Sequence, residues 1–515
     1  MEKLLAKYFP DEGIKELLNG SNFIPDVPSG GNITTKNLQQ EALLRLSINK
    51  ASLDVSQYFG KLPSYQYEEL IEWDTLREKI KALVNLENNE TLVIRNDRVI
   101  DTIKTSTEHP RAVFINNEYK YFENFENSYY NSYEKLTRNN ITYSGLNEVF
   151  EEQYKIFDNI ANNHFNGFLD GKLTVTAGFG VRGTAQAFAI NEKGGVALVT
   201  DLNSRLIEKR VEDGFCHRIF YDAESAIDYA IDMKKNGFKK TIGVVGNASD
   251  TLSEIINRGI VPNIITDATP AHEPLSYFPT GYRFQDVFRI KKIDPDYYIK
   301  ISNHSIMHYA KLMHDLQKRG SLVFEYGDAI KTTAYNKGLD SALALGNIDN
   351  IIKEVLLNNQ KVILKWFPIS NDKEDLFLID DLINLDFYDN SDLQRVSNTY
   401  TKYIFNKNLP SRKVIIDKDK LNIFLKKVNE LIRNDEISFP ILFTISYFDN
   451  FSLDNYFFKD GFFDINYFIE KIDLYKNTDF VNLSYIGTPE KYHKLEQKSI
   501  ILDGSDNIFA KLNIL

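Results

Sequence analysis

The sequence of 515 residues contains a single cysteine, Cys216. One cysteine excludes an intramolecular disulfide and a zinc site built from several thiolates, and such scarcity is typical of proteins from a reducing, cytoplasmic compartment. Free cysteines are most often buried small side chains, so we interpret Cys216 as core material rather than as a nucleophile.

Positive charge and long apolar runs are also scarce. Lysine and arginine number 61 against 72 aspartate and glutamate residues, which gives a net charge of −11 and excludes nucleic acid as an expected partner. No stretch reaches the roughly 18 apolar residues of a membrane-spanning helix, and residues 1–18 lack the apolar core of a signal peptide. With 43% hydrophobic residues, the chain is expected to fold into two or three soluble globular domains away from any membrane.

What the sequence does contain is a glycine-rich turn within Leu173–Gln186, LTVTAGFGVRGTAQ. An apolar, β-branched run precedes the turn, and a stretch able to form a helix follows it. Gly178, Gly180 and Gly183 have the G-x-G-x-x-G spacing that lets a backbone bend tightly, approach a pyrophosphate and pack a helix against a strand. The N–H groups at the start of such a helix favour a bound phosphate.

A second apolar run, residues 195–200, ends at Asp201. This carboxylate follows the glycines by about twenty residues, where dinucleotide-binding folds place the acid that binds the ribose hydroxyls. We interpret the whole segment as a dinucleotide site, and a structural turn is the alternative.

From about residue 150 to 335 the pattern alternates between helix and strand, which predicts a mostly parallel sheet covered on both faces. Ligands of such sheets bind beyond the carboxyl ends of the strands, and three further turns lie there: 246–248, 267–272 and 325–327. The predicted helices are 154–163, 204–213, 223–236, 250–258 and 295–319, and the further predicted strands are 240–245 and 261–266.

The segments on either side have weaker patterns. We predict helices over 38–48 and 69–86 and a hairpin of 91–95 with 98–102, whereas 111–150 shows little periodicity. Residues 340–515 mix helix and strand, and 439–468 is crowded with phenylalanine and tyrosine. These aromatic side chains are core or interface material first, and the lining of a pocket for a flat substrate is the alternative.

His304, His308 and His314 lie on the predicted helix 295–319. The first two are spaced i, i+4 and share a helix face, but no carboxylate of the H-E-x-x-H type and no third ligand accompanies them. We therefore predict no metal site.

Several motifs together resemble the urocanase (urocanate hydratase) family. They occur in the family's order between about residues 37 and 380. The matching segments are LQQEALLR at 38–45, TAGFGVRGTAQ at 176–186, VVGNA at 244–248, RGIVP at 258–262, TDATPAHEP at 266–274, QKRG at 317–320 and VFEYG at 323–327.

The resemblance implies an α/β fold in which a Rossmann-like parallel-sheet NAD domain is inserted into a larger mixed α/β core domain. We place the parts at 1–145 (core, N-terminal part), 146–340 (NAD domain) and 341–515 (core, divergent C-terminal part). It also implies a homodimer and a tightly held NAD that acts as an electrophile rather than a hydride carrier. An aspartate at the ribose position favours NAD over NADP, because its charge repels a 2′-phosphate. The implied cofactor contacts are Gly178, Gly180, Val181, Arg182, Gly183, Asp201, Asn247, Ala248, Thr269, Pro270, Ala271, His272, Tyr277, Phe278 and Tyr326.

The catalytic motifs of the family are altered in this chain. The position of the family's active-site cysteine aligns with Asn358, and its R-D-H-L-D segment is replaced by TISYFD at 444–449. Neutral groups cannot perform the same proton transfers or ion pairing. Tyr447 and Asp449, together with Tyr326, are the remaining acid–base candidates.

Two functions therefore stay open. The first is a NAD-dependent hydratase or lyase acting on urocanate or on an altered, urocanate-like small molecule. The second is a catalytically degenerate homologue that keeps the fold, with or without NAD, and acts by binding or regulation. Hydride transfer is a third possibility. Within the turn, Val181 and Arg182 replace a glycine and a methionine of the family, so Arg182 either adds a charge facing the pyrophosphate or Val181 crowds it.

Overall fold

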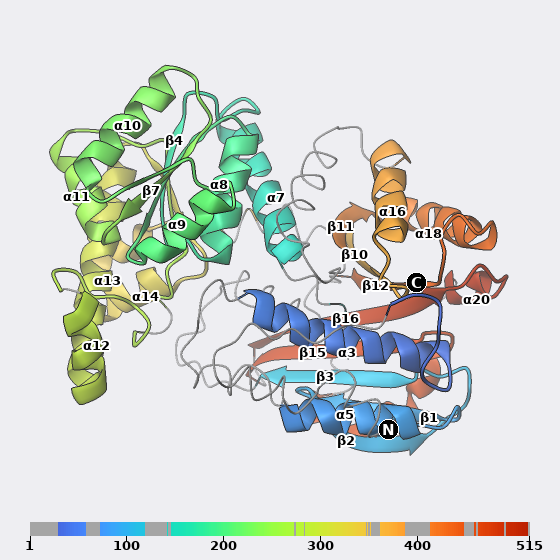
Figure 1. Cartoon of the computed structure of the whole chain (residues 1–515). Helices are drawn as coiled ribbons and strands as arrows, with labels where there is room; N and C mark the ends of the chain where they lie inside the picture. The colour runs from blue at the N-terminus through green and yellow to red at the C-terminus, as the bar shows by residue number, and fades with distance from the viewer. Residues whose placement is uncertain are drawn as a thin grey trace. The chain divides into compact units, whose positions relative to one another are not determined.

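The computed structural model describes residues 29–57, 73–118, 142, 146–271, 274–282, 284–346, 348, 351, 361–386, 412–447, 458–459, 462–488 and 491–512. The chain divides into two compact units: Val149–Val355 makes up most of one, and the segments before and after it combine to form the other. We name them the parallel-sheet unit and the mixed-sheet unit after the large sheet in each (Figure 1).

Six parallel strands form the sheet of the parallel-sheet unit, in the order β6-β7-β5-β4-β8-β9. From the central strand β4 the chain continues to β5 and its neighbours on one side, and β8 then pairs with the other side of β4. The order of the strands therefore reverses between β4 and β8, which is the point at which open parallel sheets bind ligands. The strands are β4 (Leu173–Ala177), β5 (Val196–Asp201), β6 (Arg218–Phe220), β7 (Thr241–Val245), β8 (Ile264–Asp267) and β9 (Leu322–Glu325).

Helices cover this sheet, as Figure 1 shows in green and yellow. Strand residues Val175, Leu198 and Ile242 share one core with Ile306 and Met313 of the longest helix, α13. Nearly continuous apolar strands are required when both faces of a sheet are buried. The helices are α7 (Leu146–His164), α8 (Val181–Glu192), α9 (Ser204–Glu212), α10 (Ala223–Lys235), α11 (Ala248–Asn257), α12 (Phe284–Ile293), α13 (Pro295–Lys318) and α14 (Ala329–Asn336), with a 3-10 turn η1 (Asp340–Ala344).

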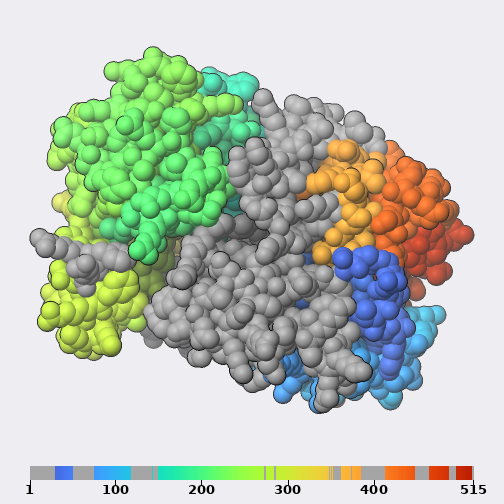
Figure 2. Space-filling view, viewed as in Figure 1, coloured from blue at the N-terminus to red at the C-terminus, as the bar shows by residue number. Residues whose placement is uncertain are grey.

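Eight strands form the large sheet of the mixed-sheet unit, in the order β11-β10-β12-β16-β15-β3-β1-β2. Strand β15 pairs with β3 in parallel although the two lie more than 300 residues apart in the sequence. The blue N-terminal and the orange-to-red C-terminal residues accordingly adjoin on the surface in Figure 2. The strands are β1 (Glu90–Arg95), β2 (Arg98–Lys104), β3 (Ala112–Glu118), β10 (Lys361–Pro368), β11 (Arg412–Asp417), β12 (Ile441–Tyr447), β15 (Phe480–Thr488) and β16 (Lys491–Leu502).

Helices α3 and α5 pack on part of one face of this sheet. Leu43 of α3 and Ile80 of α5 lie in one apolar cluster with Phe367, Leu442 and Phe480 of the strands. The mixed-sheet unit contains α3 (Leu38–Gln57), α5 (Trp73–Asn85), α16 (Lys373–Asp386), α18 (Lys418–Arg433), α19 (Ile465–Glu470), α20 (Ile508–Leu512) and η2 (Ile472–Tyr475), with a small hairpin of β13 (Phe458–Lys459) and β14 (Phe462–Phe463).

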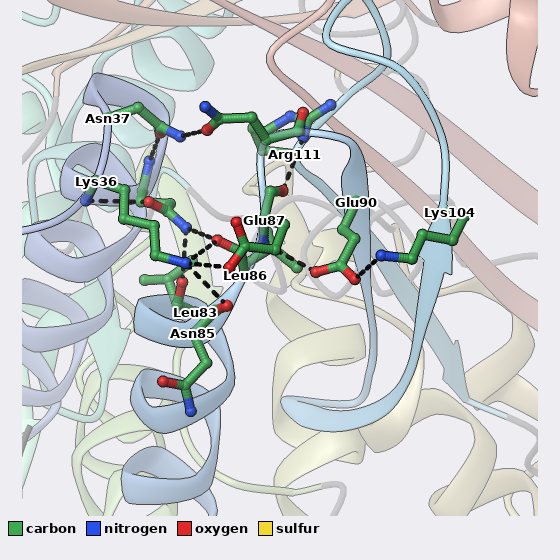
Figure 3. A network of polar contacts seen from close by, with 11 residues as sticks. Lys36, Asn37, Leu83, Asn85, Leu86, Glu87, Glu90, Lys104 and Arg111 are labelled. Carbon is green, nitrogen blue, oxygen red and sulfur yellow. Dashed lines mark hydrogen bonds and ion pairs between the residues drawn. The ribbon is translucent and has the colours of Figure 1, made fainter.

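Polar contacts fix the start of α3 against the end of α5 (Figure 3). The ammonium group of Lys36 donates to the backbone carbonyls of Asn85 and Leu86, both at 3.2 Å, and lies 2.7 Å from the carboxylate of Glu87. These carbonyls are at the C-terminal end of α5, where a cation is favourable. Inside α3, the ion pair Glu41–Arg45 is fully buried, with Nε and Oε1 2.8 Å apart.

The α/β class predicted from the sequence is confirmed, with a parallel sheet in one unit and a mixed sheet in the other. The hairpin is confirmed too: β1 and β2 pair across Asn96 and Asp97, which adopt φ values of +46° and +65°. The structure adds strands β3 and β6 and helices α12 and α14, which were not predicted, and α3 runs nine residues beyond the predicted end. Strand β6 has only three residues, and β3 is defined by its partners β1 and β15 rather than by a pattern of its own.

Candidate functional site

The glycine-rich turn lies at the carboxyl end of β4, beside the reversal in strand order. Gly178 has φ +85°, and a Cβ atom there would lie 2.8 Å from the carbonyl oxygen of Ala268. A Cβ on Gly183 would lie 1.8 Å from the carbonyl oxygen of Gly178. Both positions therefore require glycine, the first for its dihedral angle and the second for close packing of α8 on the turn.

Gly180 differs from these two glycines, because its Cβ position faces open space. Apart from its two chain neighbours, no atom of the described residues lies within 4 Å of that position. Gly180 is also the N-cap of α8, and no side chain caps this helix start. A helix N-terminus with open space before it suits a phosphate group, whose oxygens accept from the first N–H groups.

A half-buried acid, Asp201, and a buried cation, Arg210, hold the peptide of Phe179 between the first two glycines. Asp201 accepts from the backbone N–H of Phe179 at 2.7 Å and from that of Asn203 at 2.8 Å. Arg210, 1% exposed, donates through Nε to the Thr184 hydroxyl at 2.7 Å and to the Phe179 carbonyl at 3.3 Å. Burial raises the pKa of Asp201, while these backbone N–H groups and Arg210 oppose the rise. Asp201 thus braces the turn as well as lying at the predicted ribose position.

Asn247 and its neighbours form the turn after β7. Its Oδ1 accepts from the Ser249 N–H at 3.0 Å, which caps α11, and from the Thr280 hydroxyl at 3.2 Å. Its Nδ2 donates to the carbonyl of Phe278 at 3.3 Å, and Ala248 is the first residue of α11. Asn247 and Phe278, two predicted cofactor contacts that lie 31 residues apart in the sequence, are therefore hydrogen-bonded to each other.

The turn after β8 is organised by Asp267. Its Oδ2 accepts from the backbone N–H of Thr269 at 2.9 Å and from the Thr269 hydroxyl at 2.7 Å, and Ala271 donates to the Thr269 carbonyl. Burial raises the pKa of Asp267 to about 6, opposed by these hydrogen bonds. Pro270 is in the same turn and exposed, whereas Tyr277 is 4% exposed and belongs to the core. His272 lies outside the described residues.

Glu325 is the counterpart of Asp267 on the neighbouring strand, because the two are register partners at the ends of β8 and β9. Its carboxylate accepts from the N–H groups of Ile330 at 2.8 Å and Lys331 at 3.0 Å, at the start of α14. Burial raises its pKa to about 8, and the charge of Asp267 adds to the rise. The two acids thus hold the two turns that flank this edge of the sheet.

Arg182 lies against Tyr326, with its guanidinium carbon 5.1 Å from the centre of the tyrosine ring. This distance is within the range of a cation–π contact. The Tyr326 hydroxyl donates to the side-chain carbonyl of Gln153 on α7. Val181 begins α8 and is half-buried. The structure therefore brings residues 178–183, 201, 247, 269 and 326 to one edge of a single sheet.

Sequence reasoning missed Arg210 and Gln153, since neither belongs to a motif. Arg210 is spaced to project from α9 toward the turn, but only the packed structure shows it beneath Phe179. Cys216 is 3% exposed, which confirms the interpretation as core material, and burial raises the pKa of its thiol to about 11.

The predicted catalytic residues belong to the mixed-sheet unit or lie outside the described residues. Tyr447 is the last residue of β12 and pairs with Glu496 of β16. Asp449 and Asn358 lie outside the described residues. They stay predictions.

The histidines of α13 show no sign of a common ligand. His304 is exposed, with Nδ1 2.8 Å from the Lys300 carbonyl, and His314 is 7% exposed. In the described segments, no cluster of three or more metal-binding side chains occurs. Likewise, no helix among them is long and apolar enough to span a membrane.

Comparison with protein families agrees with this geometry. Residues 148–349 match the family model of the urocanase Rossmann-like domain, and residues 26–149 match that of the urocanase N-terminal domain. The first match contains the glycine turn and the turns after β7, β8 and β9, and the second contains α3 with its Glu41–Arg45 pair. The chain belongs to the urocanase family.

Proposed function

We propose that this chain is a NAD-dependent hydro-lyase that acts on urocanate or, in preference to it, on an altered, urocanate-like small acid. The observation that carries the proposal is the cradle of the glycine turn, with room at Gly180 and an uncapped α8 N-terminus beside the strand reversal. Family membership supports it, because the matched Rossmann-like domain contains this turn.

The residues present fit a dinucleotide. The turn 178–183 and the start of α8 would hold the diphosphate, and Asp201 would accept from the ribose hydroxyls with lone pairs not used by backbone N–H groups. Asn247, Thr269 and Tyr326 line the same edge. Bound NAD would supply an electrophilic ring that activates the substrate for addition of water.

The protein's own groups would prepare this edge rather than react there. Asp267 and Glu325 fix the turns that carry Thr269 and Tyr326, so the contact atoms are held before a ligand arrives. Proton transfer requires a group beside the substrate with a suitable pKa, and Tyr447 and Asp449 remain the candidates. The resemblance also predicts a homodimer, which stays part of the proposal.

A second candidate is a homologue that binds or regulates without catalysis. Two observations favour it: Asp201 already accepts from backbone N–H groups of its own chain, and Arg182 covers one face of Tyr326. In this case the turn would be a structural element, and NAD would be absent or would act as a structural or sensing ligand.

The test begins with purified full-length protein. Mass spectrometry of the denatured protein identifies bound NAD, and loss of ultraviolet absorbance with urocanate and aryl acrylates measures turnover. Absence of NAD, both in the preparation and after addition of the dinucleotide, would contradict the enzyme proposal. Bound NAD without turnover of any acrylate would favour the second candidate.

Gly180→Ala gives the matched variant. Because the added Cβ meets open space, the free energy of unfolding should stay within about 0.5 kcal/mol of the parent value. If a diphosphate approaches there, the NAD dissociation constant measured by calorimetry should rise at least roughly tenfold. Unchanged NAD affinity in this variant would place the dinucleotide elsewhere.

A further inference from the structure

One face of the eight-stranded sheet changes from apolar to polar along its strands. Leu442, Ile501 and Phe480 lie in the cluster beneath α3 and α5. Four residues along β12, Ser446 has the same orientation as Leu442, because side chains alternate along a strand. Gln497 of β16 and Asn482 of β15 continue the same face, since Ser446 pairs with Gln497 and Gln497 with Asn482.

These polar side chains form one ribbon of hydrogen bonds across four strands. Asn116 of β3 donates to Oδ1 of Asn482 at 2.8 Å, Asn482 donates to Oε1 of Gln497, and Gln497 donates to the Ser446 hydroxyl at 2.6 Å. Ser446 and Gln497 are 0% exposed and Asn482 is 1% exposed. The three side chains are uncharged, so the ribbon contributes donors and acceptors but no fixed charge of its own.

Some N–H and O–H donors of the ribbon have no acceptor within it. A primary amide has two N–H groups, and Asn482 and Gln497 each use one within the ribbon. Ser446 accepts from Gln497, so its O–H remains to be donated. The described residues provide no further acceptor for these three hydrogens. Buried donors without acceptors are costly, and native proteins match them with a water, an ion or a ligand.

All three unmatched groups are donors, which selects the chemistry of the missing partner. A carboxylate accepts at both oxygens and donates nothing, so it complements such a set. A carboxamide would turn its own N–H groups toward other donors. We propose that Asn482, Gln497 and Ser446 form the binding site for the carboxylate group of the substrate, an inference that rests on the proposed function.

Ser446 is the last residue but one of β12. A carboxylate held at Ser446 would bring the rest of a small acid to the end of that strand. The site uses side chains from β12, β15 and β16, which belong to one sheet and to one compact unit.

The test compares an acid with its amide. Binding of cinnamate and of cinnamamide to the full-length protein is measured by calorimetry, since the two differ only in having a carboxylate or a carboxamide. Gln497→Glu preserves the size of the side chain and an acceptor oxygen, but it replaces the N–H donors with a second oxygen and places a negative charge in the site. We expect this variant to weaken cinnamate binding by roughly thirtyfold or more and cinnamamide binding by less than about threefold.

Two further variants test the site if the Gln497→Glu protein folds poorly. Ser446→Ala removes one donor and should weaken cinnamate binding by roughly five- to tenfold. Ser499→Ala is the matched control: Ser499 lies on the same face and its hydroxyl contacts Thr444 at 2.8 Å, outside the proposed trio. Its cinnamate affinity should equal that of the parent protein.

Equal cinnamate affinity in parent, Gln497→Glu and Ser446→Ala proteins would overturn the site, as would failure of the parent to bind cinnamate and urocanate. Cinnamamide binding as tightly as cinnamate would also overturn it. Gln497-dependent binding of cinnamate by protein that holds no NAD would support the carboxylate site and contradict the proposed function, so the two failures are distinguishable.

Discussion

The two sheets assemble polar groups in different ways. In the parallel-sheet unit, polar groups gather at the ends of strands and include the carboxyl groups of Asp201, Asp267 and Glu325, which accept from backbone N–H groups. In the mixed-sheet unit, the ribbon of Asn116, Asn482, Gln497 and Ser446 lies on the face of the sheet and is neutral.

The difference follows from topology. Parallel strands end at one edge, so each short segment after a strand delivers its residues to the same place. In the mixed sheet, neighbours come from β3, β12, β15 and β16, and a polar group finds its partner only through strand register. A site at the strand ends should therefore be most sensitive to substitutions that change the backbone geometry of its turns. A site on the face of a sheet should be most sensitive to substitutions that remove a side-chain partner.

The largest effect is expected at Gly183. In Gly183→Ala the new Cβ would lie 1.8 Å from the Gly178 carbonyl oxygen, which belongs to the backbone and cannot move aside cheaply. The free energy of unfolding should fall by more than about 4 kcal/mol in denaturant titrations. Gly180→Ala is the control. Equal stability of the two variants would contradict the conclusion that Gly183 has no room for a side chain whereas Gly180 has.

Breaking the buried ion pair of α3 should cost nearly as much in the mixed-sheet unit. Arg45 also donates to the carbonyls of Gly30 at 2.9 Å and Asn32 at 2.8 Å, so Arg45→Met leaves Glu41 charged and the carbonyls unpaired. We expect a loss of about 3–5 kcal/mol in chemical unfolding.

The double variant Glu41→Gln with Arg45→Met is the control for that prediction. It removes the uncompensated charge and should recover part of the lost stability. A double variant that is less stable by the full sum of the single losses would show that the pair does not act as a unit.

Stability should also depend on pH through the strand-end acids. Burial raises the pKa of Asp267 to about 6 and of Glu325 to about 8, above their ordinary values, so the folded protein binds more protons than the unfolded chain. Their contribution is complete below about pH 4 and is lost as the pH rises through 6 and 8. Thermal unfolding of NAD-free protein should therefore show stability falling by about 3 kcal/mol between pH 6 and pH 8.

Asp267→Asn and Glu325→Gln should each flatten this pH dependence. The control is Asp222→Asn, since Asp222 caps α10 at the surface and its pKa is lowered by the Ser225 N–H, which moves its effect to more acid pH. A slope that is the same in all variants would assign the dependence to other groups.

The smallest expected effect is the coupling energy between two hydroxyl groups, which we compare for one pair in each unit. Thr444 and Ser499 lie 2.8 Å apart in the mixed sheet, and Thr200 and Thr251 lie 3.2 Å apart in the parallel-sheet unit. Double-mutant cycles with Thr→Val and Ser→Ala should give coupling energies of about 0.5–1 kcal/mol for both pairs. A coupling near zero at Thr444–Ser499 alone would mean that hydroxyl pairing on that face contributes little.

The sequence by itself determined the part of this protein that depends on local geometry. A turn that needs φ +85° at Gly178 and no side chain at Gly183 must show glycine at both places. The strands around it are apolar because both faces are buried, so the alternation of helix and strand along 150–335 predicted the sheet, and the order of the motifs is that of the urocanase family.

Only the tertiary structure decided which distant residues meet. Arg210 beneath Phe179, Arg182 on Tyr326, and the pairing of Glu325 with Asp267 depend on packing between elements that carry no mutual signal. The same holds for the ribbon, in which Asn116 and Asn482 are joined across 366 positions. Register across strands is set by the burial of whole faces and not by any short segment, so a single sequence cannot specify it.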